Sequence, residues 1–262
     1  MTPALTRRHA LAAGAATLLL ARRAAAAEIR IVSSGGFAAA YKALAPGFEK
    51  ETGHSLAAGW GPSMGQTPQA VPARLARGEP IDVVIMVGYA LGKLVEEGKV
   101  LADSRADLAR SGIGVAVRAG APHPRIGTVE ELRQTLLAAK SVAYSDSASG
   151  VYIEREMLKR MGIAEQLAGR ARMIPAEPVG EVVARGGAEI GFQQLSELKP
   201  IHGIDILGPL PSELQQYTVF SAGVVATSRE PEAARALVRY LASPEAAPAI
   251  LESGMEPLAK PR

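Results

Sequence analysis

Four turns of the chain combine residue types that bind small anions. Each turn follows a β-rich run and precedes a helical pattern, and together they span residues 31–36, 60–65, 144–150 and 175–179. A helix N-terminus carries unpaired backbone N–H groups and a partial positive charge, and the glycine and serine residues of these turns add close approach and hydroxyl donors. The turns therefore predict a cleft for a small anion. In any single turn, a Ser or Asp before a helix can instead serve only as an N-cap.

Charged side chains near these turns suggest further contacts. Arg74 and Arg77 are three residues apart and would share one edge of a helix. Because a guanidinium can bind a carboxylate through two parallel hydrogen bonds, we expect Arg74 to contact the ligand; the alternative is a solvated basic helix end. Asp146, Glu177 and Glu181 are candidate general bases, or else caps and dipole partners of helices.

The common catalytic and metal-binding patterns are absent from the sequence. There is no cysteine, and the four histidines, at positions 9, 54, 123 and 202, lack the spacing of metal ligands. There is also no GxGxxG fingerprint, no Walker lysine and no GxSxG motif. We therefore expect neither a metal ion nor an organic cofactor.

The distribution of charge argues against a nucleic-acid partner. The net charge is +3, but residues 1–27 hold four of the 29 Lys and Arg residues and none of the 26 Asp and Glu residues. The rest of the chain has 25 basic and 26 acidic residues and is close to neutral. Such a body does not favour DNA, RNA or a membrane surface, so we expect a small-molecule ligand.

The first 27 residues have the three regions of an export signal. Arg7 and Arg8 precede an apolar run over residues 10–21, and the alanines at 25–27 form a cleavage site before Glu28. The apolar run is too short to span a bilayer, and the arginine pair is similar to a twin-arginine signal. We expect export to the periplasm; a fraying, alanine-rich helix is the alternative.

After this segment, β-rich runs alternate with helical patterns, which predicts an α/β fold. Ala40, Leu44 and Phe48 recur every four residues and mark the buried face of the first expected helix. The expected strands cover residues 28–33, 55–61, 82–87, 113–118, 142–145, 172–176, 189–193, 205–207 and 218–227. The expected helices cover residues 37–52, 67–76, 90–97, 129–139, 150–161, 180–185, 231–242 and 244–253. If there are two lobes, we expect the chain to cross between them at residues 112–118 and 216–222.

Three runs of the sequence resemble a known family. Residues 28–35 (EIRIVSSG), 74–85 (RLARGEPIDVVI) and 94–100 (LVEEGKV) resemble type II periplasmic solute-binding proteins, in particular the molybdate-binding-like branch. The resemblance extends over residues 28–262 and implies a two-lobed α/β fold with the ligand cleft between the lobes. It also implies that the protein delivers a small anion to an ABC-type membrane transporter. Because the sequence shows no strong sign of oligomerisation, we expect a monomer. The implied lobes are residues 28–112 with 220–262, and residues 113–219.

The resemblance also implies which residues hold the ligand. Molybdate binders use two serines, backbone amides of the second lobe and a tyrosine hydroxyl. By position, these roles fall on the four turns described above and on residues 191–194, where there is no tyrosine. We expect Gln193 or Gln194 to donate in its place, which suits a polar ligand larger than molybdate. The other expected contacts are Ser34, Gly35, Gly36, Ser63, Ser147, Ser149, Gly150, Val151 and Val179.

Three functions remain open at this point. Departures from the molybdate pattern favour a receptor for an organic di- or tricarboxylate. The same branch contains aconitate isomerase, which interconverts trans- and cis-aconitate by a cofactor-free 1,3-allylic proton shift, and binding of an oxyanion is the third possibility. An isomerase needs a base near a ligand carbon, and Glu177, Tyr152 and His54 are the candidates. A carboxylate, Tyr or His at the centre of the cleft would favour the enzyme, and a cleft lined solely by donors would favour the receptor.

Overall fold

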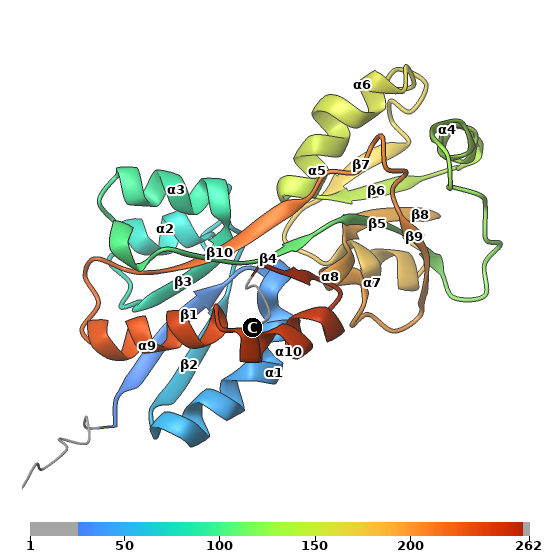
Figure 1. Cartoon of the computed structure of the whole chain (residues 1–262). Coiled ribbons are helices and arrows are strands. Elements are labelled where there is room, and N and C mark those ends of the chain that lie inside the picture. The colour runs from blue at the N-terminus through green and yellow to red at the C-terminus, as the bar shows by residue number, and fades with distance from the viewer. Residues whose placement is uncertain (1–25, 259–262) are drawn as a thin grey trace, which may run out of the picture.

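Two β-sheets organise the described part of the chain. The computed structural model describes residues 26–258, so the expected export signal lies, apart from its last two residues, outside the described residues. The first sheet has six strands in the order β11-β4-β10-β3-β1-β2, and the second has five in the order β7-β6-β8-β5-β9. Figure 1 shows the two sheets next to each other, each with its own helices. The predicted two-lobed α/β fold is confirmed.

The first sheet is parallel on one side and antiparallel on the other. β1 pairs in parallel with β2 and β3, whereas β10 runs antiparallel to β3 and β4. In Figure 1, α2 and α3 lie on one face of this sheet, and α1, α9 and α10 lie on the other. The strands are β1 (Glu28–Ser33), β2 (Ser55–Trp60), β3 (Val83–Val87), β4 (Ala106–Ser111), β10 (Thr218–Val224) and β11 (Glu256–Pro257). The helices are α1 (Gly35–Thr52), α2 (Val71–Ala76), α3 (Gly88–Glu96), α9 (Pro231–Leu241) and α10 (Ala247–Glu252), with 3-10 turns η1 (Ala102–Ser104) and η3 (Pro244–Ala246).

The second sheet has separate hydrophobic cores on its two faces. One core includes side chains of α4 and α5, and the other includes side chains of α7. The strands are β5 (Ile113–Arg118), β6 (Val142–Ser145), β7 (Ala171–Ile174), β8 (Ile190–Gln194) and β9 (Ile204–Pro209). The helices are α4 (Val129–Ala138), α5 (Ala148–Tyr152), α6 (Leu158–Arg160), α7 (Val179–Ala184) and α8 (Leu195–Leu198), and a π-helical turn, η2 (Ile153–Met157), joins α5 to α6.

The sequence patterns explain why these elements form. In β1, Ile29 and Ile31 are buried while Glu28 and Arg30 are exposed, as expected for the start of a strand with one solvated face. α1 buries the predicted stripe, which includes Leu44 and Phe48. It ends at Gly53, whose left-handed φ of 76° closes the last turn with an N–H bond to the carbonyl of Glu49.

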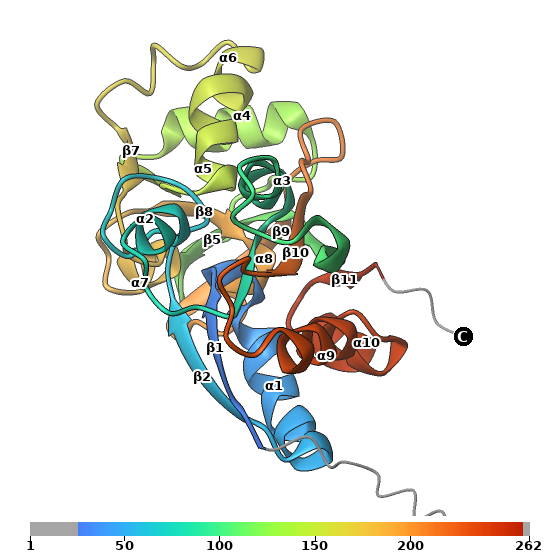
Figure 2. The same ribbon diagram turned by 90° about the vertical axis from the view of Figure 1, so that its left-hand side faces the viewer.

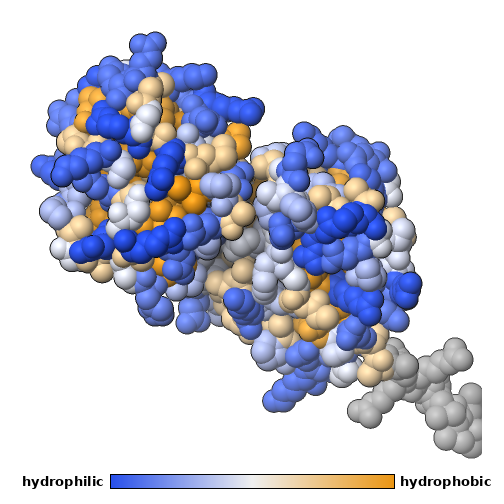
Figure 3. All heavy atoms as spheres, turned by 180° about the vertical axis from the view of Figure 1, so that it is seen from behind, coloured by the Kyte–Doolittle hydropathy of each residue, from blue (hydrophilic) through white to orange (hydrophobic). Residues whose placement is uncertain are grey.

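The chain changes sheets at two points near the site. It leaves the first sheet after Ser111 and enters the second at Ile113, and it has returned to the first sheet by Thr218. The Gln194 amide joins both crossings: in the orientation that satisfies its atoms, its nitrogen donates to the Ser111 carbonyl at 2.9 Å and its oxygen accepts from the Thr218 hydroxyl at 2.8 Å. The expected lobe boundary at residues 219/220 falls inside β10. Figure 3 shows the two parts of the molecule as rounded bodies with a waist between them.

Candidate functional site

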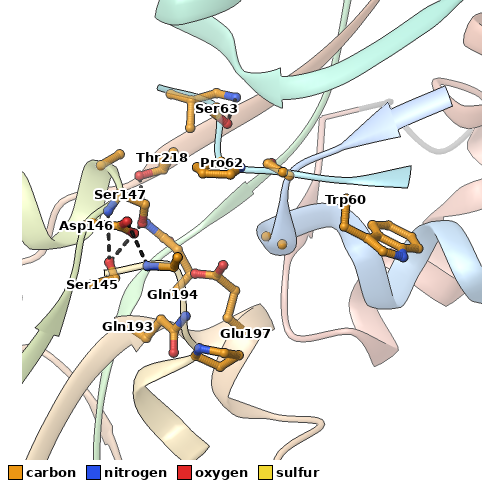
Figure 4. Close-up of a pocket in the computed structure, with 18 of the residues that line it drawn as sticks. Trp60, Pro62, Ser63, Ser145, Asp146, Ser147, Gln193, Gln194, Glu197 and Thr218 are labelled. Atoms are coloured by element: carbon orange, nitrogen blue, oxygen red, sulfur yellow. Dashed lines mark hydrogen bonds between the residues drawn. The ribbon is translucent and has the colours of Figure 1, made fainter. Parts of the chain in front are cut away.

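A cleft of about 560 Å³ lies between the two sheets. Its walls come from turns at the carboxyl ends of β1, β2, β6 and β7, together with α8 and the start of β10. Figure 4 shows these side chains converging from both sides, and Figure 2 shows the fold from the side. Eight of the residues singled out from the sequence line this cleft: Ser34, Gly35, Gly36, Ser63, Asp146, Ser147, Glu177 and Gln193.

The turn from β1 into α1 brings backbone close to the cleft. The N–H groups of Gly35 and Gly36 lie in the first turn of an 18-residue helix, where they have no acceptor within the helix. Ser34 is buried, and its hydroxyl has no hydrogen-bond partner among the described residues. A side chain at Gly36 would meet the Phe220 ring at 2.1 Å, so only glycine fits there. This turn can therefore present neutral donors to an anion.

The turn after β2 places the Ser63 hydroxyl at the cleft. Its hydroxyl is buried and accepts a hydrogen bond of 2.9 Å from the Val87 N–H at the end of β3. Since the hydroxyl hydrogen is not used in that bond, it remains free to donate to a ligand.

Three serine hydroxyls form a hydrogen-bonded group at the turn from β6 into α5. The Ser145 hydroxyl lies 2.9 Å from that of Ser147 and 3.0 Å from that of Ser149. Of the last two, Ser147 lines the cleft, whereas Ser149 is 1% exposed and holds the turn from within. Asp146 accepts a 3.0 Å hydrogen bond from the N–H of Ala176, which has a left-handed φ of 56°. The carboxylate thus joins two of the predicted turns.

Glu197 is the functional candidate that the sequence analysis missed. It lies on α8, a short helix that was not predicted, and its partly buried carboxyl faces the start of α1 across the cleft. The pKa of Glu197 is raised to about 7, mainly by burial and also by the nearby Asp146 charge, while the polar groups of Gln193 and Gln194 oppose the shift. A carboxyl group that titrates near neutral pH can accept and return a proton.

The cleft has an unusual balance of charge. Among the described residues, those lining it include Asp146, Glu177 and Glu197 but no Lys, Arg or His. Glu177 is paired with Arg185, which lowers the pKa of its carboxyl and makes it a weaker base. An anion in this cleft would be held by hydroxyl and backbone N–H groups rather than by a cation.

The structure does not bring Arg74 to the cleft lining. Its guanidinium forms an ion pair with Glu79, with one bond of 2.9 Å, and a longer bond of 3.4 Å to the Trp60 carbonyl. The Glu79 carboxylate therefore takes up the guanidinium N–H groups that we expected to bind a ligand carboxylate. The expected contact between Arg74 and the ligand is therefore not seen. Arg74 instead binds Glu79 and the carbonyl of Trp60, the last residue of β2.

Several other expected site residues also have structural roles. The N–H of Val179 donates to the Gln193 amide oxygen at 2.9 Å and is not available to a ligand. Val151 and Tyr152 line a neighbouring pocket, and the Tyr152 hydroxyl donates to the Leu214 carbonyl at 2.8 Å.

Two expected site residues lie away from the lining altogether. Gly150 packs against Ser145, where a Cβ would come within 1.6 Å of the carbonyl oxygen. His54 lies just before β2, and its Nδ1 accepts from the Ala27 N–H at 3.1 Å. Of the base candidates named from the sequence, Asp146 and Glu177 reach the described cleft lining.

The described residues offer little for a metal ion or a membrane. No group of three or more His, Asp or Glu side chains within residues 26–258 is arranged to hold a metal. In the same range, no helix combines the length and apolar character needed to cross a bilayer.

Two lobes around a donor-lined cleft define a periplasmic-binding-protein type of molecule. A family model for bacterial extracellular solute-binding proteins matches residues 29–256, and the chain belongs to this family. The resemblance stated from the sequence is confirmed.

Individual relatives agree on the branch of the family. A protein from a Pseudomonas species named aconitate isomerase is 55% identical over 230 residues, covering 88% of each chain. The molybdate-binding protein ModA of Azotobacter vinelandii is 29% identical over 250 residues, covering 90% of this chain and 92% of the relative. The solved structure of a periplasmic molybdate-binding protein from the same organism superimposes with a TM-score of 0.68 and 22% identity, covering 87% of this chain and 98% of the other.

Proposed function

We propose that this protein is an exported isomerase that interconverts trans- and cis-aconitate in the cleft between its sheets. The observation that carries the proposal is Glu197, a carboxyl group with a raised pKa in a cleft whose lining, among the described residues, has no cationic side chain. A receptor that only holds a polycarboxylate would be weakened by a carboxylate in its site, because like charges repel. An enzyme that moves a proton between two carbons needs such a group. The 55% identical relative named aconitate isomerase supports the same function.

The proposed reaction moves one proton within one substrate molecule. The Glu197 carboxylate removes a proton from the methylene carbon of trans-aconitate, so that a C–H bond breaks, an O–H bond forms and the electron pair spreads over a dienolate. Glu197 then returns the proton to the far allylic carbon, which forms a new C–H bond and moves the double bond. A pKa near 7 makes both the acid and the base form available at neutral pH.

Neutral donors would hold the substrate during this shift. Negative charge on the dienolate develops on carboxylate oxygens, where preorganised donors stabilise it most. The available donors are the N–H groups of Gly35 and Gly36 and the hydroxyls of Ser34, Ser63 and Ser147. We assign the carboxylate clamp to these groups, which come from both sides of the cleft.

The proposed location is the periplasm. The arginine pair and apolar run of the first 27 residues support export, as does membership of an extracellular solute-binding family. An isomerase of this kind would act as a monomer on a free polycarboxylate. Delivery of the anion to an ABC-type transporter belongs to the receptor alternative, which the fold family supports.

Proton NMR of the purified protein with trans-aconitate in heavy water tests the proposal. We expect signals of cis-aconitate to appear, with deuterium entering at the allylic carbon when the proton on Glu197 exchanges with solvent. Buffer without protein is the control. Saturable line broadening without conversion would make the protein a carboxylate receptor, and no interaction at all would exclude tricarboxylates as its ligands.

A further inference from the structure

We propose that Thr67 is a further substrate-binding residue: its buried hydroxyl donates a hydrogen bond to a carboxylate oxygen of the substrate from the loop after β2. For the identity of that substrate, trans-aconitate, this inference rests on the proposed function. Its structural basis is the state of the Thr67 hydroxyl and the place of the loop in the cleft.

A small set of buried hydroxyls has no hydrogen-bond partner among the described residues. The four atoms are Ser34 Oγ, Tyr41 Oη, Thr67 Oγ1 and Ser196 Oγ. Such a hydroxyl is unfavourable, because it has lost its hydrogen bonds to water and has gained none in the protein. Of the four residues, Ser34 and Thr67 line the cleft. A ligand bound in the cleft would supply a partner for both hydroxyls.

The loop that carries Thr67 crosses the end of β1. In the first sheet, β1 lies between β2 and β3, and the three strands are parallel. The loop leaves β2 after Trp60, and its Ser63 hydroxyl accepts from the Val87 N–H at the end of β3. Residues 61–63 therefore pass over the carboxyl end of β1, where Ser34 follows the strand. Figure 4 shows Pro62 and Ser63 along this part of the cleft.

Backbone hydrogen bonds hold the loop in place. The Val71 N–H donates to the Pro62 carbonyl at 3.0 Å and closes the loop, and the Ala70 N–H donates to the Thr67 carbonyl at 3.0 Å. The carbonyl of Thr67 is thus used in the fold, whereas its hydroxyl is not. The loop therefore presents a fixed hydroxyl to the cleft, and that hydroxyl makes no contribution to the loop's own hydrogen bonding.

The charge of the cleft makes a neutral donor valuable. Among the described residues, no cationic side chain lines the cleft, and each carboxylate of a tricarboxylate needs several hydrogen-bond donors. A threonine hydroxyl keeps its hydrogen at any pH of interest, so it can donate to a carboxylate but cannot serve as the base. Thr67 should therefore affect the binding of the substrate and leave the proton transfer to Glu197.

The substitution Thr67→Val tests this role, because it keeps the shape of the side chain and removes the hydroxyl. We expect the calorimetric Kd and the KM for trans-aconitate to rise by roughly 10-fold, with kcat nearly unchanged. We expect the melting temperature of the ligand-free protein to stay the same or to rise, because an unpartnered hydroxyl leaves a buried position. A hydroxyl with a purely structural role would give the opposite pattern, a lower melting temperature with an unchanged Kd.

Three further variants complete the comparison. Thr67→Ser keeps the hydroxyl and should retain the affinity of the wild-type protein, and Thr67→Ala replaces Thr67→Val if the latter does not fold. Thr135→Val on α4 is the matched control: the Thr135 hydroxyl donates to the Arg125 carbonyl at 2.8 Å, so its loss should lower the melting temperature and leave Kd unchanged.

The possible results separate this inference from the proposed function. An unchanged Kd in a folded Thr67→Val or Thr67→Ala variant would overturn the role of Thr67, and so would an equal loss of affinity in Thr67→Ser. A wild-type protein that binds trans-aconitate without converting it would overturn the proposed isomerase. The affinity comparison would still decide the role of Thr67 in that case, because it does not require turnover.

Discussion

The Glu197 carboxyl and Gly35 meet across the cleft with no room for a side chain between them. A Cβ added to Gly35 would lie 2.5 Å from the Glu197 Oε1 atom, inside any normal contact distance. Gly35 opens α1 next to the first sheet, whereas Glu197 is on α8, which follows the last residues of β8 in the second sheet. Because Gly35 has no side chain, the Glu197 carboxyl can occupy its position in the cleft.

Gly35→Ala should consequently lower kcat while the protein stays folded. The added methyl group would push the Glu197 carboxyl aside, and a displacement of about 1 Å in a reacting group can cost roughly 100-fold in rate. Steady-state kinetics with trans-aconitate measures the loss, and circular dichroism checks the fold. Gly92→Ala on α3 is the matched control, since its nearest neighbour is the Arg105 guanidinium at 3.3 Å, far along a flexible side chain. Equal rates for both variants would contradict the assigned position of the base.

Two glutamates at the cleft should respond differently to the same substitution. Glu197→Gln should reduce kcat by roughly 10²- to 10⁴-fold, the usual contribution of a general base, while trans-aconitate still binds. Glu177→Gln should retain most of the activity, because Glu177 is paired with Arg185 and its pKa is lowered. Turnover and calorimetric binding on both variants provide the comparison. If Glu177→Gln were the inactive variant, Glu177 would be the base, as the sequence analysis allowed.

The raised pKa of Glu197 also predicts an effect on stability. Between its ordinary value of 4.5 and the folded value of about 7, the native state binds a proton that the unfolded chain has released. The contribution of Glu197 to the free energy of unfolding therefore falls as pH rises through this window, by roughly 3 kcal/mol at most. Glu197→Gln removes the titrating group, so it should be more stable than wild type at pH 8 and similar to it at pH 5. Urea unfolding of both proteins at pH 5 and pH 8 measures the difference in their free energy of unfolding. The same difference at both pH values would contradict the raised pKa of Glu197.

The fold could be predicted from the sequence because its main elements have strong local patterns. The bounds of β1, β5 and β6 agree with the expected ranges, and α1 buries the predicted stripe. β4 was missed because Asp107 and Arg110 interrupt its apolar residues. Its place between β10 and β11 depends on pairing with distant segments, which no local pattern reveals.

The site was only partly predictable, for a related reason. Turns with small residues before helices can be recognised locally, and Ser34, Ser63 and Ser147 do line the cleft. Glu197 could not be selected, because α8 has only four residues and its carboxyl is functional only through burial and distant neighbours. The available signal was weak: Leu195 and Leu198 are three residues apart before a proline at position 200.

The sequence and the structure predict different effects for the substitution Arg74→Ala. The sequence alone predicts that Arg74→Ala weakens anion binding, whereas the ion pair with Glu79 predicts a loss of stability with KM for trans-aconitate unchanged. Because this pair is only partly exposed, its loss should lower the free energy of unfolding by about 1–2 kcal/mol. Thermal unfolding and steady-state kinetics measure the two quantities. Arg77→Ala is the control, since Arg77 is half exposed and lies 3.4 Å from the same carboxylate. A tenfold rise in KM for Arg74→Ala alone would return Arg74 to the ligand site and would require the cleft to rearrange around its substrate.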